Sequence, residues 1–131
     1  MKNILVDMSA TLIHHGHIRL LKKASKFGKV IVALTTDQGI RKSKGYIPEL
    51  NFNQRKEILL SIKYVSKVIK SDWLIDKNFL KMNKIHYLVH GNDCANPVPI
   101  KKKIIFKRTQ GISSNEIRNK ILKNFFIKFL K

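Results

Sequence analysis

The pattern His14-x-Gly16-His17 near the amino terminus is the part of this sequence best suited to chemistry. Two imidazoles can donate hydrogen bonds to phosphate oxygens, and the first turn of a helix presents backbone N–H groups and the positive end of its dipole to an anion. The pattern stands between an apolar run typical of a strand and a periodic segment typical of a helix, which is where α/β proteins bind phosphates. We therefore expect a nucleotide site here.

The segments around this pattern alternate between expected strands and expected helices. Short apolar runs rich in β-branched side chains predict strands at residues 3–7, 29–34, 65–69, 85–90 and 103–106. Helical spacing of apolar residues predicts helices at residues 18–27, 52–64, 72–82 and from about 115 onward. Asn51 or Asn53 is expected to cap the second helix, and Ser113 or Ser114 the last one. Residues 37–51 are polar and contain glycine and proline, so we expect a long functional loop with a basic tip at residues 41–44.

This alternation predicts an α/β fold, a Rossmann-like, doubly wound, five-stranded parallel sheet in a three-layer α/β/α arrangement. We expect residues 1–131 to form a single nucleotide-binding domain, with residues 117–131 as a carboxyl-terminal helix and tail. In such a sheet the carboxyl ends of the strands meet at one edge. Three distant segments should therefore share one crevice, namely residues 8–17, 91–94 and 107–114.

Composition narrows the function classes further. The net charge is +19, but the lysines are scattered from Lys2 to Lys131, which is typical of a solvated surface and does not favour nucleic acid as the partner. Neither a membrane span nor a signal peptide is expected, because no apolar stretch is long enough and no cleavage site follows the first strand, so we expect a cytoplasmic protein. The single cysteine, Cys94, cannot form an internal disulfide, and no Cys/His group has zinc-finger spacing.

Four features together resemble the cytidylyltransferase family. They are His14-x-Gly16-His17, Arg55 at the head of a helix, Gly91-Asn-Asp93 after the fourth strand, and Arg108-Thr-Gln-Gly-Ile-Ser-Ser114. The similarity runs from about Ile4 to Ile121. It is closest to the small bacterial glycerol-3-phosphate cytidylyltransferases and to the cytidylyltransferase domains of phosphonate pathways.

The resemblance implies transfer of CMP from CTP to a small alcohol phosphate. A phosphate oxygen of the acceptor would attack the α-phosphate of CTP, giving a CDP-linked product and pyrophosphate. Such a reaction needs a site that holds two anions in line and stabilises the charge that builds on the phosphates. Mg²⁺ is expected to arrive with CTP, and no metal site made by the protein is expected.

The resemblance also implies a role for particular residues. The expected catalytic residues are His14, His17, Lys44 and Arg108, while His15 is expected to be dispensable. The expected nucleotide-binding residues are Ser9, Ala10, Gly16, Gly91, Asp93, Arg108, Thr109, Ser113 and Ser114, and Asp93 is suited to the ribose hydroxyls. The expected acceptor-binding residues are Thr11, Arg55 and Lys63.

Two departures from the family leave the acceptor open. Thr11 stands where the glycerol-3-phosphate enzymes typically carry the aspartate of G-T-F-D, and Lys63 stands where the family often has arginine, whose two-pronged grip on phosphate lysine lacks. The acceptor is therefore expected to be an alcohol phosphate like glycerol-3-phosphate or, alternatively, a phosphonate such as 2-hydroxyethylphosphonate.

A hypothesis from another class is a catalytically weakened relative that binds nucleic acid or an anionic membrane through its basic surface. Residues 125–131 support it, since they are apolar and basic in the manner of an interfacial helix. We nevertheless expect this segment to pack on the domain or across a dimer. The expected partners are thus CTP, a small phosphate or phosphonate ester and a second copy of the chain, with weak anionic-membrane association as the alternative.

Overall fold

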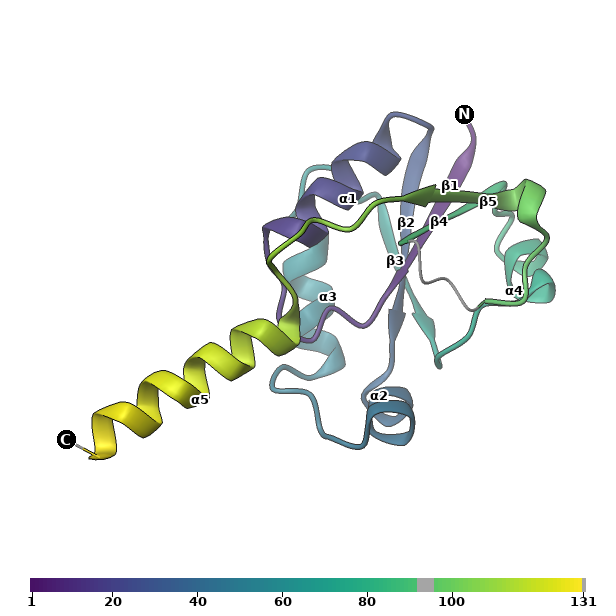
Figure 1. Cartoon of the computed structure of the whole chain (residues 1–131). Helices are drawn as coiled ribbons and strands as arrows, with labels where there is room; N and C mark the ends of the chain where they lie inside the picture. Colours follow the sequence, from purple (N-terminus) through teal and green to yellow (C-terminus); the bar gives the residue numbers. More distant parts are fainter. Residues whose placement is uncertain (92–95, 131) are drawn as a thin grey trace.

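The computed structural model describes residues 1–91 and 96–130, and a five-stranded parallel sheet forms its centre (Figure 1). The strand order is β3-β2-β1-β4-β5, which confirms the predicted doubly wound parallel sheet. The strands are β1 (Asn3–Met8), β2 (Lys29–Thr35), β3 (Lys67–Ser71), β4 (Tyr87–Gly91) and β5 (Lys103–Phe106). The last of these has the predicted bounds, whereas β3 and β4 begin and end slightly later than predicted.

Helices connect the strands. They are α1 (His15–Ser25), α2 (Asp37–Lys44), α3 (Phe52–Leu60), α4 (Lys77–Met82) and α5 (Ser114–Leu130), with a single 3-10 turn, η1 (Ile100–Lys102), before β5. Two of them are shorter than predicted. α3 ends at Leu60, and α4 begins only at Lys77, where the side chain of Asp76 accepts a hydrogen bond from the backbone N–H of Phe79.

The expectation of a long loop at residues 37–51 is wrong for its first half, which forms α2. The side chain of Thr36 caps this helix by accepting a hydrogen bond from Gly39, and Gly45, at a φ of 79°, ends it. Gly39 was a misleading loop signal. Its lack of a side chain serves close packing, because a Cβ there would lie 2.1 Å from the backbone oxygen of Asp72.

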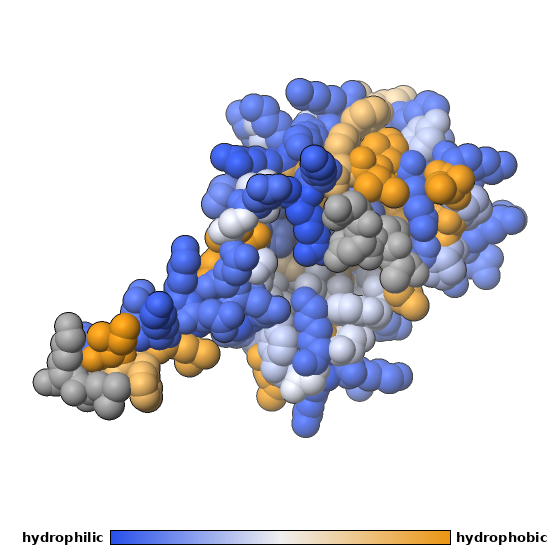
Figure 2. Space-filling view, viewed as in Figure 1, coloured by the Kyte–Doolittle hydropathy of each residue, from blue (hydrophilic) through white to orange (hydrophobic). Residues whose placement is uncertain are grey.

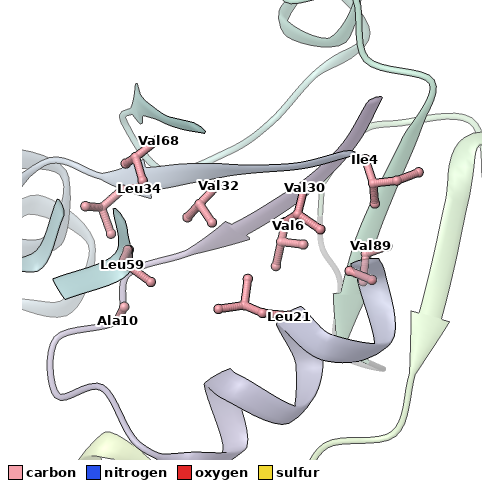
Figure 3. Close-up of a cluster of buried hydrophobic side chains, with 11 residues drawn as sticks. Ile4, Val6, Ala10, Leu21, Val30, Val32, Leu34, Leu59, Val68 and Val89 are labelled. Carbon is pink, nitrogen blue, oxygen red and sulfur yellow. The ribbon is translucent and has the colours of Figure 1, made fainter. Parts of the chain in front are cut away.

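Both faces of the sheet are covered, which confirms the predicted three layers. On one face, the strand residues that include Val6, Val32 and Val89 pack against α1 and α3 through Leu21 and Leu59 (Figure 3). The opposite face packs against the α4 region through a second apolar cluster, formed by Leu5, Ile31, Ala33, Ile75, Leu80, Ile85, Leu88 and Val98. Burial on two faces explains why these strands are apolar almost throughout.

Helix α5 is the exception to this packing. It extends away from the sheet and its flanking helices (Figure 1), and its residues 121–128 are all exposed. Of the two alternatives for the end of the chain, packing on the domain is therefore wrong for residues 125–128, and packing across a dimer stays a prediction. Within the described part of the chain, no helix is both long and apolar enough to cross a membrane.

Arg55, in the first turns of α3, ties together the backbone at the carboxyl ends of β1 and β2. Its side chain is fully buried, and its Nη1 donates to the carbonyl oxygens of Ser9 at 2.6 Å and Thr35 at 2.9 Å. Its Nε donates to the carbonyl of Leu50, and its Nη2 pairs with the carboxylate of Asp37 at 2.6 Å. One guanidinium thus binds three carbonyls and a carboxylate, and it joins the strand ends to α2 and α3.

We predict that Arg55→Met lowers the free energy of unfolding by about 3 kcal/mol, because it removes these hydrogen bonds together and leaves buried carbonyls unpaired. Urea denaturation measures this change. The matched control is Lys56→Met, one position along the same helix and only partly buried, which should change stability by less than about 1 kcal/mol. Equal effects of the two substitutions would refute the role of Arg55 as the tie between the strand ends.

Candidate active site

A cleft of about 500 Å³ opens where the carboxyl ends of the strands meet. It is lined by the turn after β1, the start of α1, the end of α2 and the segment from Phe106 to Asn115. Most of the predicted site residues line it, namely Ser9, Ala10, His14, Gly16, His17, Lys44, Arg108, Thr109, Ser113 and Ser114. The structure therefore brings the His-x-Gly-His pattern and the last loop together, as the sequence predicted.

The two histidines hold each other at the beginning of α1. His14 is the capping residue, and its Nδ1 accepts a hydrogen bond of 3.1 Å from the backbone N–H of Gly16. In return, Nδ1 of His17 accepts one of 3.1 Å from the backbone N–H of His14. Because Nδ1 of each ring is an acceptor, the proton of each neutral ring lies on Nε2. Each histidine can thus donate from Nε2 to an anion in the cleft.

The surroundings keep these imidazoles neutral. Burial, with the nearby charges of His14, Arg108 and Lys44, lowers the pKa of His17 to about 3. The pKa of His14 is lowered by burial and by His15, with Glu116 acting weakly in the opposite direction. At neutral pH the cleft therefore offers neutral N–H donors beside permanent cations. A bound polyanion would raise both pKa values, since it favours the protonated form.

Gly16 permits the last loop to approach the histidine turn. A Cβ on Gly16 would lie 2.8 Å from Cε1 of His14 and 3.3 Å from the side chain of Ile112. Any larger residue would push the His14 ring out of its capping position. The glycine of the pattern is thus required by close packing within the site.

The turn after β1 is held in an unusual conformation. Ala10 has a φ of 47°, in the left-handed region that residues with a Cβ seldom adopt, and it is 2% exposed. The preceding Ser9 is fixed from two sides, because its carbonyl accepts from Arg55 and its hydroxyl lies 3.2 Å from Nζ of Lys44. Lys44, from the last turn of α2, also lies 5.7 Å from the ring centre of Trp73. These contacts bring a lysine to the cleft.

Two serines join the last loop to the rest of the site. Ser113 caps α5, since its hydroxyl accepts a hydrogen bond from the backbone N–H of Glu116. Ser114 bridges to the histidine turn, where its hydroxyl donates to the carbonyl of Leu12 at 3.0 Å and accepts from the N–H of the same residue at 3.3 Å. The two serine hydroxyls therefore hold the last loop and the start of α5 in place, and Arg108 and Thr109 line the cleft.

The three expected acceptor-binding residues do not line the cleft, which corrects that expectation. Arg55 is buried below it and bound to the backbone. Thr11 is 1% exposed, and its hydroxyl has no hydrogen-bond partner within the described residues. Lys63 is exposed beyond the end of α3, with its Nζ 5.2 Å from the ring centre of Tyr64. Residue type does not predict the burial of an arginine or a threonine, so this placement was not predictable from the sequence.

Gly91 is the last residue of β4 and is paired in register with Phe106 of β5. Asp93, an expected nucleotide-binding residue, and Cys94 lie outside the described residues.

A polar cluster at the cleft was not predicted from the sequence. Asp7, at the end of β1, has one carboxylate oxygen 3.2 Å from Nε2 of His90 on β4, and its other oxygen accepts from the amide of Asn96 at 2.9 Å. The Asn96 side chain in turn accepts from the backbone N–H of Ile75 at 2.7 Å. Several more cations also line the cleft, namely Arg19, Lys23 and Lys107. A polar residue ending an otherwise apolar strand was the available signal for Asp7.

The donor set of the cleft does not suit a metal ion held by the protein. Asp7 is the only acidic residue among the described residues that line the cleft, and one carboxylate does not supply the several oxygen ligands that a protein-held Mg²⁺ ion needs. No group of three or more potential metal ligands occurs in the described part of the chain. A Mg²⁺ ion usually needs carboxylates or phosphate oxygens, so at this site it would depend on the phosphates of a substrate.

Comparison with known proteins agrees with this arrangement. Residues 9–120 match a family model described as cytidylyltransferase-like. The glycerol-3-phosphate cytidylyltransferase of Staphylococcus aureus is 33% identical to the chain, and the match covers 92% of this chain and 96% of that protein. A probable choline-phosphate cytidylyltransferase of Schizosaccharomyces pombe is also 33% identical over 93% of this chain, which spans only 37% of that longer protein.

The fold is shared with a solved structure as well. The crystal structure of a lipopolysaccharide core biosynthesis protein from Thermoplasma volcanium superposes with a TM-score of 0.61 at 22% identity, covering 94% of this chain and 88% of the other. At that identity the likeness concerns the fold alone. The family match over most of the chain, together with the histidine turn and the last loop on one cleft, leads to one conclusion: the chain belongs to the cytidylyltransferase-like family.

Proposed function

We propose that this protein transfers CMP from CTP to a small alcohol phosphate, giving a CDP-linked product and pyrophosphate. The observation that carries the proposal is the meeting of His14, His17, Lys44 and Arg108 on one cleft at the strand ends. The reactions named for the similar proteins, on glycerol-3-phosphate, choline-phosphate and ethanolamine-phosphate, support it. A cytoplasmic location and assembly as a homodimer belong to the proposal through the same resemblance.

In the proposed reaction an oxygen of the acceptor phosphate forms a bond to the α-phosphorus of CTP, and the bond from that phosphorus to the bridging oxygen of the β-phosphate breaks. The electron pair leaves with pyrophosphate. The Nε2–H groups of His14 and His17, both on the cleft, would donate to the phosphate oxygens where negative charge builds. Lys44 and Arg108 supply permanent positive charge, and Arg108 is able to grip two oxygens at once.

Mg²⁺ enters this proposal as part of the substrate. It would neutralise part of the triphosphate charge and hold its oxygens in a reactive arrangement. The residues of this chain contribute the binding surface, the donors at the histidine turn and the cations of the cleft wall.

Among alcohol phosphates, the cleft favours an acceptor whose alcohol carries an ammonium group. The reason is Asp7, the one carboxylate among the described lining residues of an otherwise cationic cleft. The carboxylate would repel an acceptor that carries only negative charge, but it would attract an ammonium group. Glycerol-3-phosphate and 2-hydroxyethylphosphonate, which lack an ammonium group, are therefore the comparison acceptors.

Pyrophosphate release with Mg²⁺ and each nucleoside triphosphate tests the reaction. We expect turnover with CTP and an alcohol phosphate, with the highest kcat/KM for choline-phosphate or ethanolamine-phosphate. No turnover with any acceptor of the panel, although CTP binds, would contradict the proposed function.

Replacement of Asp7 tests the choice of acceptor separately. Asp7→Asn should raise the KM for an ammonium-bearing acceptor by about tenfold or more, because one charged contact is lost. The KM for glycerol-3-phosphate should change by less than about twofold. Equal changes for both kinds of acceptor would show that Asp7 does not recognise the ammonium group.

Replacement of His17 tests the charge-stabilising donor. His17→Ala should lower kcat by at least about 100-fold, the usual effect of removing one preorganised donor from a transition state. The matched control is His15→Ala, an exposed residue two positions before His17 in the same helix, which should stay within about twofold of the original protein. A His17→Ala enzyme within threefold of the original would remove His17 from the mechanism.

The protonation state of His17 is directly measurable. With a pKa near 3, the free protein should keep this ring neutral, with its proton on Nε2, throughout titration from pH 8 to pH 5. Because the folded-state pKa lies below the ordinary value of 6.5, His17 should favour folding above that value and cost stability as the pH falls below it. Imidazole ¹H–¹⁵N spectra report the tautomer and the titration. A ring that titrates near pH 6.5 in the free protein would contradict this assignment.

A further inference from the structure

Helix α5 carries large apolar side chains that are exposed. Ile121, Leu122, Phe125 and Phe126 are 46%, 68%, 53% and 66% exposed. At 100° per residue these four positions fall on one side of the helix. Figure 2 shows apolar side chains on the outer half of the projecting helix, before the part drawn in grey.

The other side of the same helix is basic. By the same spacing Lys120 and Lys123 fall there and Lys128 falls at its border with the apolar side. All three lysines are exposed, and between Lys120 and Lys128 the exposed Ile127 is the one apolar residue on that side. No acidic residue follows Glu116 in the sequence. An apolar side with two phenylalanines beside a side of lysines is the pattern of helices that lie in the surface of a membrane.

We propose that α5 lies in the surface of an anionic lipid bilayer, with Leu122, Phe125 and Phe126 among the acyl chains and the lysines at the headgroups. Charge decides between this partner and a second copy of the chain. A dimer that packed α5 against α5 of a second copy would bring Lys120, Lys123 and Lys128 close to the same lysines of that copy, whereas a dimer through another surface would leave α5 uncovered. An anionic bilayer offers an apolar interior for one side of the helix and negative charge for the other. A nucleic acid duplex would match the lysines but would leave the apolar side in water.

Flotation of the full chain with vesicles tests the proposal without reference to the enzymatic reaction. We expect the bound fraction to be at least about tenfold higher with phosphatidylcholine mixed with phosphatidylglycerol than with phosphatidylcholine alone. The double substitution Phe125→Ser and Phe126→Ser should lower binding to the anionic vesicles at least about tenfold. Both residues lie outside the cleft, so CTP turnover should remain within about twofold.

A matched pair of charge variants separates the helix from the general surface charge. Lys123→Glu with Lys128→Glu should abolish binding to the anionic vesicles, while Lys77→Glu with Lys81→Glu, the same charge change on exposed positions of α4, should have a small effect. Equal losses in both pairs, or no preference of the original protein for anionic vesicles, would overturn the proposal. The proposal would also be overturned if the protein forms a dimer without lipid and the Phe125→Ser and Phe126→Ser double variant is a monomer. The apolar side would then bind a second copy of the chain.

Discussion

A single buried guanidinium underlies the geometry of the cleft. Arg55 reaches from α3 beneath the strand ends and binds the carbonyls of Ser9 and Thr35, which belong to the turn after β1 and to the end of β2. Ala10, which has left-handed backbone angles, directly follows Ser9, so the hydrogen bond from Arg55 to Ser9 helps to hold this strained turn in place. The position of the histidine turn depends on this arrangement, and so does the contact between Lys44 and Ser9.

The two histidines at the start of α1 have both a structural role and a proposed chemical role. Their Nδ1 atoms complete the backbone hydrogen bonding at the start of α1, which leaves the Nε2 protons for the cleft. The same cations that suit a triphosphate, Arg108 and Lys44, help to keep His17 neutral when no anion is bound. Substrate charge and histidine protonation are therefore coupled, because an anion that offsets these cations also makes a protonated ring less costly.

The sequence was sufficient for features that repeat along the chain or lie close together in it. Apolar runs predicted the parallel sheet, and the His-x-Gly-His pattern and the last loop predicted the walls of the cleft. Features that depend on distant partners were missed. Arg55 is buried because the carbonyls that it binds come from other strands, and the Asp7–Asn96 contact joins residues 89 positions apart. Gly39 wrongly predicted a loop, because the sequence alone does not show that its backbone packs closely against Asp72.

The distribution of charge around the cleft bears on how quickly a substrate arrives. Arg19, Lys23, Lys44, Lys107 and Arg108 line the opening, and Asp7 is the only acid among the described lining residues. A concave surface of one sign concentrates the electric field and draws oppositely charged molecules from solution before any contact forms. For a substrate as negative as CTP, the rate of encounter would thus be set by the ionic strength of the medium, falling as dissolved salt shortens the range of the attraction.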